Sequence, residues 1–166
     1  YADLERVEYS SLRASLYEEP RVPRADWHFD AGYLFGASNR QHAGLFASYG
    51  ARFNRSLFLG IGSGFIYGMV ETLDMVIPVY GHLRAYLPVR GPIKPFVDLR
   101  PGYSFAPMHG ISGFYGTALV GLDIWRFTCG AGIGTVCNAF DKHSFDDRTV
   151  TPFRATGLTL HIGMTL

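Results

Sequence analysis

Residues 77–87 of the chain read IPVYGHLRAYL, and residues 94–105 read KPFVDLRPGYSF. In the first stretch most odd positions are apolar, while the even positions carry Tyr80, His82, Arg84 and Tyr86. In the second stretch the even positions include Asp98 and Arg100, and the odd positions are again mostly apolar. Because successive side chains of a β-strand point to opposite faces, this two-residue period predicts two strands, each with an apolar and a polar face.

The same period recurs in six further segments after residue 26, and it sorts their side chains in the same way. These segments are residues 27–35, 45–53, 57–67, 114–124, 127–134 and 158–166. Charged residues within the segments fall on the face that also carries glycine, serine and histidine. Five large apolar residues share that face: Leu34, Phe46, Phe58, Ile66 and Leu119. The pattern predicts an all-β chain of eight strands.

The direction of the sorting separates two kinds of barrel. A soluble barrel such as a lipocalin has an apolar interior, whereas a membrane barrel turns its apolar face to lipid and its polar face to the lumen. The apolar runs are too short for a transmembrane helix of roughly 18 residues or more. Charged residues make up 17% of the chain, below the usual value of about 25%. We therefore expect an eight-stranded, antiparallel, up-and-down transmembrane β-barrel with a closed lumen filled by side chains.

The connections between the expected strands alternate in length, as they do in outer-membrane barrels. Short turns are expected at residues 54–56, at residues 89–93 and near Trp125, and outer loops at residues 38–42, 69–74, 106–112 and 138–149. An even number of strands places both ends of the barrel on one side of the membrane. We expect a bacterial outer-membrane location with both termini in the periplasm.

Residues 1–26 have a different composition from the rest of the chain. They contain no glycine, six acidic residues and four arginines. We expect a periplasmic N-terminal arm or short helix here, with the barrel domain at residues 27–166. The first residue is Tyr1 and no apolar leader is present, so a signal peptide is expected to have been removed. Cys129 and Cys137 lie too far apart along one strand to form a disulfide.

The predicted polar face collects three acids and three arginines, with histidines beside them. The set is Asp30, Arg52, Arg84, Asp98, Arg100 and Asp123, together with His28, His82 and His161. Unpaired charges would be costly inside a narrow barrel, so a buried ion-pair network is expected. The alternative is that the same residues line a narrow path for protons or ions. No metal site and no cofactor are expected.

Two glycine series resemble a dinucleotide-binding loop only superficially. Gly60, Gly62 and Gly64 form one series, and Gly130, Gly132 and Gly134 form the other. Such a loop must lie between a strand and a helix, whereas these glycines fall inside predicted strands. We expect them to make room for Tyr80, Tyr86 and Arg84.

Three further groups of residues give expectations of their own. Pro78, Pro95 and Pro101 each remove a ladder donor and predict bulges or strand ends. Outward aromatic residues near strand ends predict interfacial anchors; they are Trp27, Tyr33, Tyr49, Phe53, Tyr67, Tyr103, Phe114 and Phe127.

His143 and Ser144 are the one weak candidate for a catalytic pair. Neighbouring residues of a strand point to opposite faces, so they are poorly placed for catalysis.

The segments at residues 77–87 and 94–105, with the final segment GLTLHIGMTL at residues 157–166, resemble the small porin-like outer-membrane β-barrel proteins of Bacteroidetes. The resemblance covers about residues 27–166 and implies a Gram-negative outer-membrane location and a barrel fold. Members of that family usually end on an aromatic residue, and Leu166 departs from this pattern.

These observations favour a structural or interaction protein that the barrel anchors in the outer membrane, without catalytic activity. The expected partners are outer-membrane lipid and lipopolysaccharide, together with a protein partner bound through the loops or the N-terminal arm. A net charge of +1 gives no footprint for nucleic acid. Two alternatives stay open: a lipid A modifying enzyme, either a deacylase or an acyltransferase, and a narrow pore.

Overall fold

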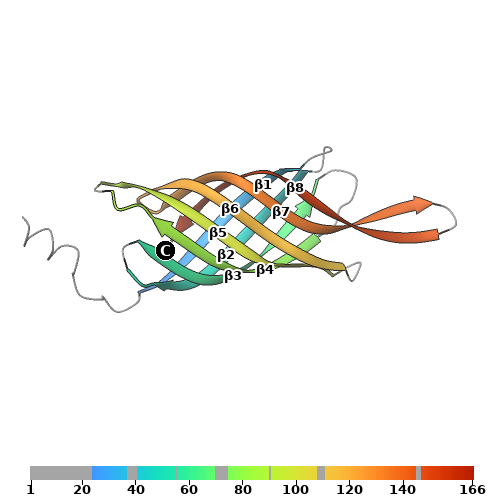
Figure 1. Ribbon diagram of the computed structural model, residues 1–166, viewed down its shortest axis with the longest axis horizontal. Coiled ribbons are helices and arrows are strands. Elements are labelled where there is room, and N and C mark those ends of the chain that lie inside the picture. Colours follow the sequence, from blue (N-terminus) through green and yellow to red (C-terminus); the bar gives the residue numbers. More distant parts are fainter. Residues whose placement is uncertain are drawn as a thin grey trace, which may run out of the picture.

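The chain folds into a closed barrel of eight antiparallel strands, each paired with its neighbours in sequence, with β8 paired to β1 (Figure 1). The computed structural model describes residues 24–36, 41–54, 56–69, 75–89, 91–107, 111–144 and 147–166, without the side chains of residues 111 and 138–153. The strands are β1 (Arg24–Gly36), β2 (Gln41–Arg52), β3 (Leu57–Gly68), β4 (Met75–Tyr86), β5 (Ile93–Ala106), β6 (Ile111–Ile124), β7 (Phe127–Ser144) and β8 (Asp147–Thr165). The predicted fold class is confirmed.

The connections between strands lie at the two ends of the barrel. At one end, where β8 finishes and the C-terminus is marked in Figure 1, strands are joined by residues 53–56, 87–92 and 125–126. We call this the turn end. The opposite loop end carries the connections at residues 37–40, 69–74, 107–110 and 145–146. Between the strand bounds, the connections span 4, 6 and 2 residues at the turn end and 4, 6, 4 and 2 residues at the loop end, so the expected alternation in length is wrong.

Two strand boundaries differ from those expected. The outer loop expected at residues 138–149 is wrong, because β7 and β8 pair without interruption up to Ser144 and Asp147. Their hairpin extends beyond the rest of the barrel in Figure 1. β1 begins at Arg24, so Asp26 belongs to the barrel wall rather than to the arm expected at residues 1–26. Residues 1–23 lie outside the described part of the chain.

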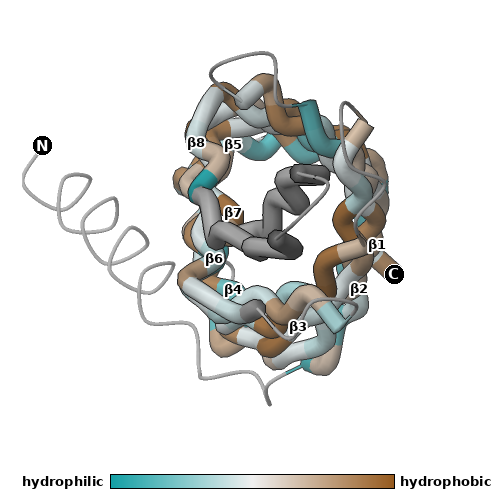
Figure 2. Tube along the Cα trace, turned by 90° about the vertical axis from the view of Figure 1, so that its right-hand side faces the viewer, coloured by the Kyte–Doolittle hydropathy of each residue, from teal (hydrophilic) through white to brown (hydrophobic). Residues whose placement is uncertain are grey.

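Side chains alternate between the lumen and the outer surface along the strands. Figure 2 looks down the barrel and shows the strands as a closed ring. Ile61, in the middle of β3, is 74% exposed on the outer surface, whereas Asp98 on β5 is completely buried. The five inward apolar residues noted in the sequence are all buried. In the described part of the chain, no helix has the length and apolar character needed to cross a bilayer.

Apolar side chains fill the lumen near both of its ends. Phe58, Tyr86 and Phe96 form a cluster near the turn end. A larger cluster lies toward the loop end and consists of Leu34, Phe46, Ile66, Val76, Tyr80, Ala106, Tyr115, Val136 and Ala155. We call these the lower and upper apolar clusters. Buried charged side chains occupy the lumen between them.

The prolines lie within strands rather than at bulges or ends. Pro78 interrupts the ladder between β3 and β4, and Pro101 interrupts that between β4 and β5, but the register is the same on both sides of each gap. A missing N–H removes a bond without inserting a residue, so no bulge forms. The Ser63 hydroxyl donates to the carbonyl of Pro78 at 2.9 Å. Pro95 lies within β5, paired with Leu122.

Candidate functional site: a buried ion-pair network in the lumen

Asp98 on β5 is the centre of the buried network. Its Oδ2 atom lies 2.7 Å from Nη2 of Arg84 and 2.8 Å from Nε2 of His82. Its Oδ1 atom accepts from Nε of Arg100 at 2.9 Å. Charge-assisted bonds of this kind offset the desolvation of buried charges. One carboxylate therefore holds two guanidinium groups and an imidazole at the middle of the lumen.

Arg100 carries the network across the lumen to the first and last strands. Its Nη1 atom lies 2.7 Å from Oδ2 of Asp30 on β1. The same oxygen lies 2.7 Å from Nδ1 of His161 on β8. Strands β1, β5 and β8 are thus joined through side chains, in addition to the ladder between β1 and β8.

Arg84 carries the network toward the turn end. Its Nη1 atom lies 3.4 Å from Oδ1 of Asp123 and 3.4 Å from Nδ1 of His28. The Thr128 hydroxyl donates to the same Asp123 oxygen at 2.7 Å. The guanidinium carbon of Arg84 lies 4.2 Å from the centre of the Phe96 ring, so an aromatic face also contacts the buried cation.

Arg52 forms an ion pair that sequence analysis did not foresee. Its Nε atom lies 2.8 Å from Oδ2 of Asp26, at the turn end of the lumen. The Arg52 side chain is 24% exposed and also lies over the ring of Tyr86 at 5.0 Å. Asp26 has the same sequence parity as His28 and Asp30, so extending the alternation by one step would place it on the inner face as well.

The structure therefore brings most of the predicted lumen residues into one network. Its members are His28, Asp30, His82, Arg84, Asp98, Arg100, Asp123 and His161. Arg52 belongs to the separate pair with Asp26.

The glycines on the inner face make room for rings, although mostly not for those expected. A Cβ added at Gly62 would lie 2.5 Å from the Tyr80 ring, as the sequence suggests. The nearest side chains at Gly60, Gly64 and Gly130 are Phe58, Phe46 and Phe96 instead. The expected packing of Tyr86 and Arg84 against these glycines is therefore wrong, because phenylalanines of the two apolar clusters occupy the space.

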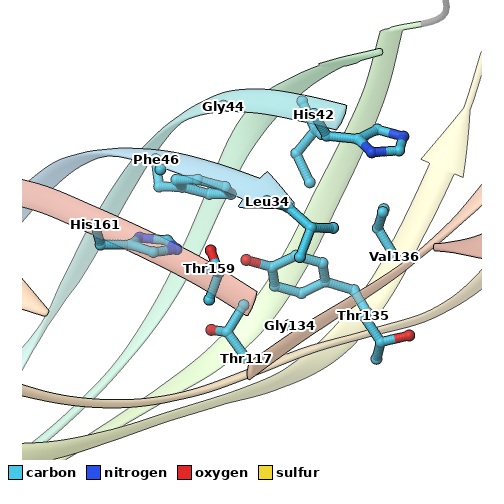
Figure 3. Close-up of a pocket in the computed structure, with 13 residues that line it drawn as sticks. Leu34, His42, Gly44, Phe46, Thr117, Gly134, Thr135, Val136, Thr159 and His161 are labelled. Carbon is cyan, nitrogen blue, oxygen red and sulfur yellow. The ribbon is translucent and has the colours of Figure 1, made fainter. Parts of the chain in front are cut away.

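Toward the loop end the lumen holds a cavity of only about 20 Å³, close to the volume required by one water molecule. Figure 3 shows Phe46, His161, Leu34 and Thr159 around it. The Phe46 and His161 rings stack with their centres 5.3 Å apart. Nothing larger than water fits here without movement of these side chains.

Among the described residues no group of three His, Cys, Asp or Glu side chains is arranged to hold a metal ion. The weak catalytic candidates His143 and Ser144 lie in β7, opposite Arg148 and Asp147. Their side chains lie outside the described part, so their chemistry stays a prediction. Both described cysteines, Cys129 and Cys137, are free.

The outward aromatics lie in two rows. Trp27, Tyr49 and Phe127 lie near the turn end, and Trp27 and Tyr49 are cross-strand partners with ring centres 4.7 Å apart. Near the loop end lie Tyr33, Tyr67, Tyr103 and Phe114. Among these, Tyr103 pairs across strands with Phe114, and the Tyr33 hydroxyl donates to the side chain of Gln41.

No family model matches this chain, and no curated protein matches it significantly. Among solved structures, the crystal structure of Neisserial surface protein A is similar, with a TM-score of 0.51 and 13% sequence identity. The match covers 89% of this chain and 99% of the other. At that identity the likeness concerns the fold, which resembles that of an outer-membrane β-barrel.

Proposed function

We propose that this chain is an outer-membrane protein of a Gram-negative bacterium, in which the barrel spans the membrane as a structural or interaction anchor. The observation that supports this proposal is the way the barrel sorts its side chains: the ion-pair network lies in the lumen, and aliphatic side chains cover the outer surface. Ile61, Ile133 and Ile162 are each more than half exposed on the outer surface. Soluble monomers rarely expose apolar patches above a few hundred Å², so a lipid environment best accounts for this surface.

The filled lumen favours an anchor over a narrow pore. Asp98 and Arg100 are completely buried, and the lower and upper apolar clusters lie on either side of the network. An aqueous path would have to pass both clusters. The lipid A modifying alternative has no support from the described side chains.

The orientation, partners and family belong to the same proposal. In outer-membrane barrels the longer extensions face outward, so the β7–β8 hairpin that projects beyond the barrel at the loop end supports a periplasmic turn end. The two rows of aromatics are suited to the two membrane interfaces. Lipid, lipopolysaccharide and a protein partner bound at the loops or at residues 1–26 are the proposed contacts. A Bacteroidetes origin rests on the resemblance of residues 77–87, 94–105 and 157–166 alone.

Membrane fractionation combined with gel migration before and after heating tests the proposal. A folded membrane barrel is expected in the outer-membrane fraction, with migration that changes on boiling. A protein that stays soluble without detergent and shows no such change would overturn it. Planar-bilayer recording tests the narrow pore, and we expect it to show no conductance. Mass spectrometry of lipid A tests the enzyme, and we expect the lipid A mass to be unchanged when His143 and Ser144 are both replaced by alanine.

A further inference from the structure

The turn end of the barrel holds an open cavity of about 480 Å³, separate from the small cavity near the loop end. Four cationic side chains line it: Arg24, Arg52, Lys94 and Arg126. Its acidic lining residues are Asp26 and Asp123. We call this cavity the vestibule. The side chains of its described lining carry two more positive than negative charges.

The two acids are already engaged with other cations. Asp26 pairs with Arg52 at 2.8 Å and with Arg24 at 3.6 Å. Asp123 pairs with Arg84, deeper in the lumen. Within the described part of the chain, neither Lys94 nor Arg126 has an ion pair, although both line the vestibule and are exposed. The excess positive charge therefore lies on groups that can meet a ligand.

The ladder concentrates this charge rather than dispersing it. Arg24 and Arg52 are direct cross-strand partners, and their even positions place both on the inner face. Like charges opposite each other destabilise a sheet. Asp26 contacts both side chains but neutralises only one of their charges. An anion bound in the vestibule would relieve the repulsion that remains.

The turn between β6 and β7 gives an independent sign of a functional constraint. It consists of Trp125 and Arg126, and the φ angle of Trp125 is +59°. Asparagine, aspartate or glycine is favoured at such positions in two-residue hairpins, whereas a bulky residue is strained. Backbone strain of this kind clusters at ligand sites. Here the strained residue is Trp125 itself, whose indole is 86% exposed and lies beside Arg126 at the edge of the vestibule.

We propose that the vestibule binds a phosphate group, with Lys94 and Arg126 as its principal ligands and Arg52 as a supporting cation. Arg126 offers the forked donor geometry that suits phosphate oxygens, and Lys94 offers a compact charge. Two sources share this chemistry: free phosphate and the headgroup of an anionic phospholipid. The proposed site is formed by side chains at the turn end of the lumen. Its test in detergent therefore does not require that the proposed outer-membrane location is correct.

The chain contains two tryptophans, Trp27 and Trp125, which makes a direct assay possible. In a Trp27→Phe background, Trp125 is the single indole and reports on the vestibule. The purified full chain in a neutral detergent is titrated with inorganic phosphate at constant ionic strength set with chloride. A saturable change in Trp125 emission is expected. Lys94→Gln and Arg126→Gln are each expected to weaken binding about tenfold, the effect of losing ~1.4 kcal/mol.

Arg154→Gln is the matched control, because it removes one exposed positive charge from β8 near the loop end. It is expected to bind phosphate like the parent. Heat-modifiable migration checks that each variant is folded. The second arm compares vesicles of phosphatidylcholine with and without phosphatidylglycerol. A Trp125 response that appears only with phosphatidylglycerol, and is lost in both vestibule variants, identifies the lipid headgroup as the source.

A response to inorganic phosphate that depends on Lys94 and Arg126 identifies free phosphate as a ligand. The proposal is overturned if neither probe changes Trp125 emission, or if the vestibule variants respond like the parent or like Arg154→Gln. A soluble protein that still binds phosphate through these residues would contradict the proposed membrane role while leaving the phosphate site intact. The two failures are therefore distinguishable.

Discussion

Arg100 on β5 and Asp30 on β1 meet across the lumen, with Nη1 2.7 Å from Oδ2, although β1 and β5 are not neighbours in the barrel. The pair fixes the separation of opposite walls, which no ladder hydrogen bond does. Asp98 completes the arrangement by holding the other side of the same guanidinium. The stability of the barrel should therefore depend strongly on these carboxylates.

Replacing Asp98 with asparagine is expected to lower the free energy of unfolding by about 3–5 kcal/mol, because Arg84 and Arg100 would lose a buried counter-charge. Urea unfolding in lipid vesicles, followed by tryptophan fluorescence, measures the loss. Arg24→Gln is the control, since its side chain is 83% exposed and its pair is expected to contribute about 0–1 kcal/mol. Equal effects of the two changes would contradict a stabilising network.

Salt is expected to distinguish the Arg52–Asp26 ion pair from the buried ion pairs of Asp98. Arg52 is partly exposed, so its pair with Asp26 should weaken as ionic strength rises, whereas the fully buried contacts of Asp98 should not. The destabilisation caused by Asp26→Asn should shrink when unfolding is measured in high salt. That caused by Asp98→Asn should stay constant. Identical salt dependence would show that water reaches both pairs.

Gly62→Ala is expected to destabilise the barrel by about 1–3 kcal/mol through overpacking. The new methyl group would lie 2.5 Å from the Tyr80 ring and 2.6 Å from Oγ of Ser48. Gly81→Ala is the matched control, because the nearest atom to its added Cβ is 3.9 Å away. Comparison of the two unfolding midpoints tests whether bare backbone at Gly62 accommodates Tyr80.

Ile61→Arg tests the outer surface. At the middle of a membrane barrel, an outward arginine is expected to lower folding stability in vesicles by about 2–4 kcal/mol. Val89→Arg, in a connection at the turn end, should cost about 0–1 kcal/mol if that end lies at a membrane interface as proposed. A similar small cost at both positions would argue against lipid around Ile61.

Much of the fold could be predicted from the alternation because a two-residue period fixes both the face and the direction of sorting. Arg84, Asp98 and Arg100 could be placed in the lumen from parity alone. Their partners could not, because pairing across the lumen depends on barrel closure and on the stagger between strands. For the same reason parity alone places Arg52 with the central acids, whereas in the structure it pairs with Asp26.

The remaining errors have local causes. Residues 138–149 contain several polar side chains, which are typical of loops, yet the hairpin of β7 and β8 continues through them because two neighbouring strands can pair beyond the barrel wall. Pro78 and Pro101 suggested bulges, but the flanking register compensates for one missing donor. The vestibule combines residues from six strands and two turns, and no linear motif connects them.

The contacts of Asp30 have a consequence for how the barrel assembles. Its partners come from β5, midway along the chain, and from β8, the last strand. A sheet that has not yet closed would leave Asp30 without its contacts to His161 on β8 and, across the lumen, to Arg100 on β5. Closure of the first strand on the last therefore completes the set of contacts around Asp30, so the side chains of the lumen favour the closed barrel over an open sheet.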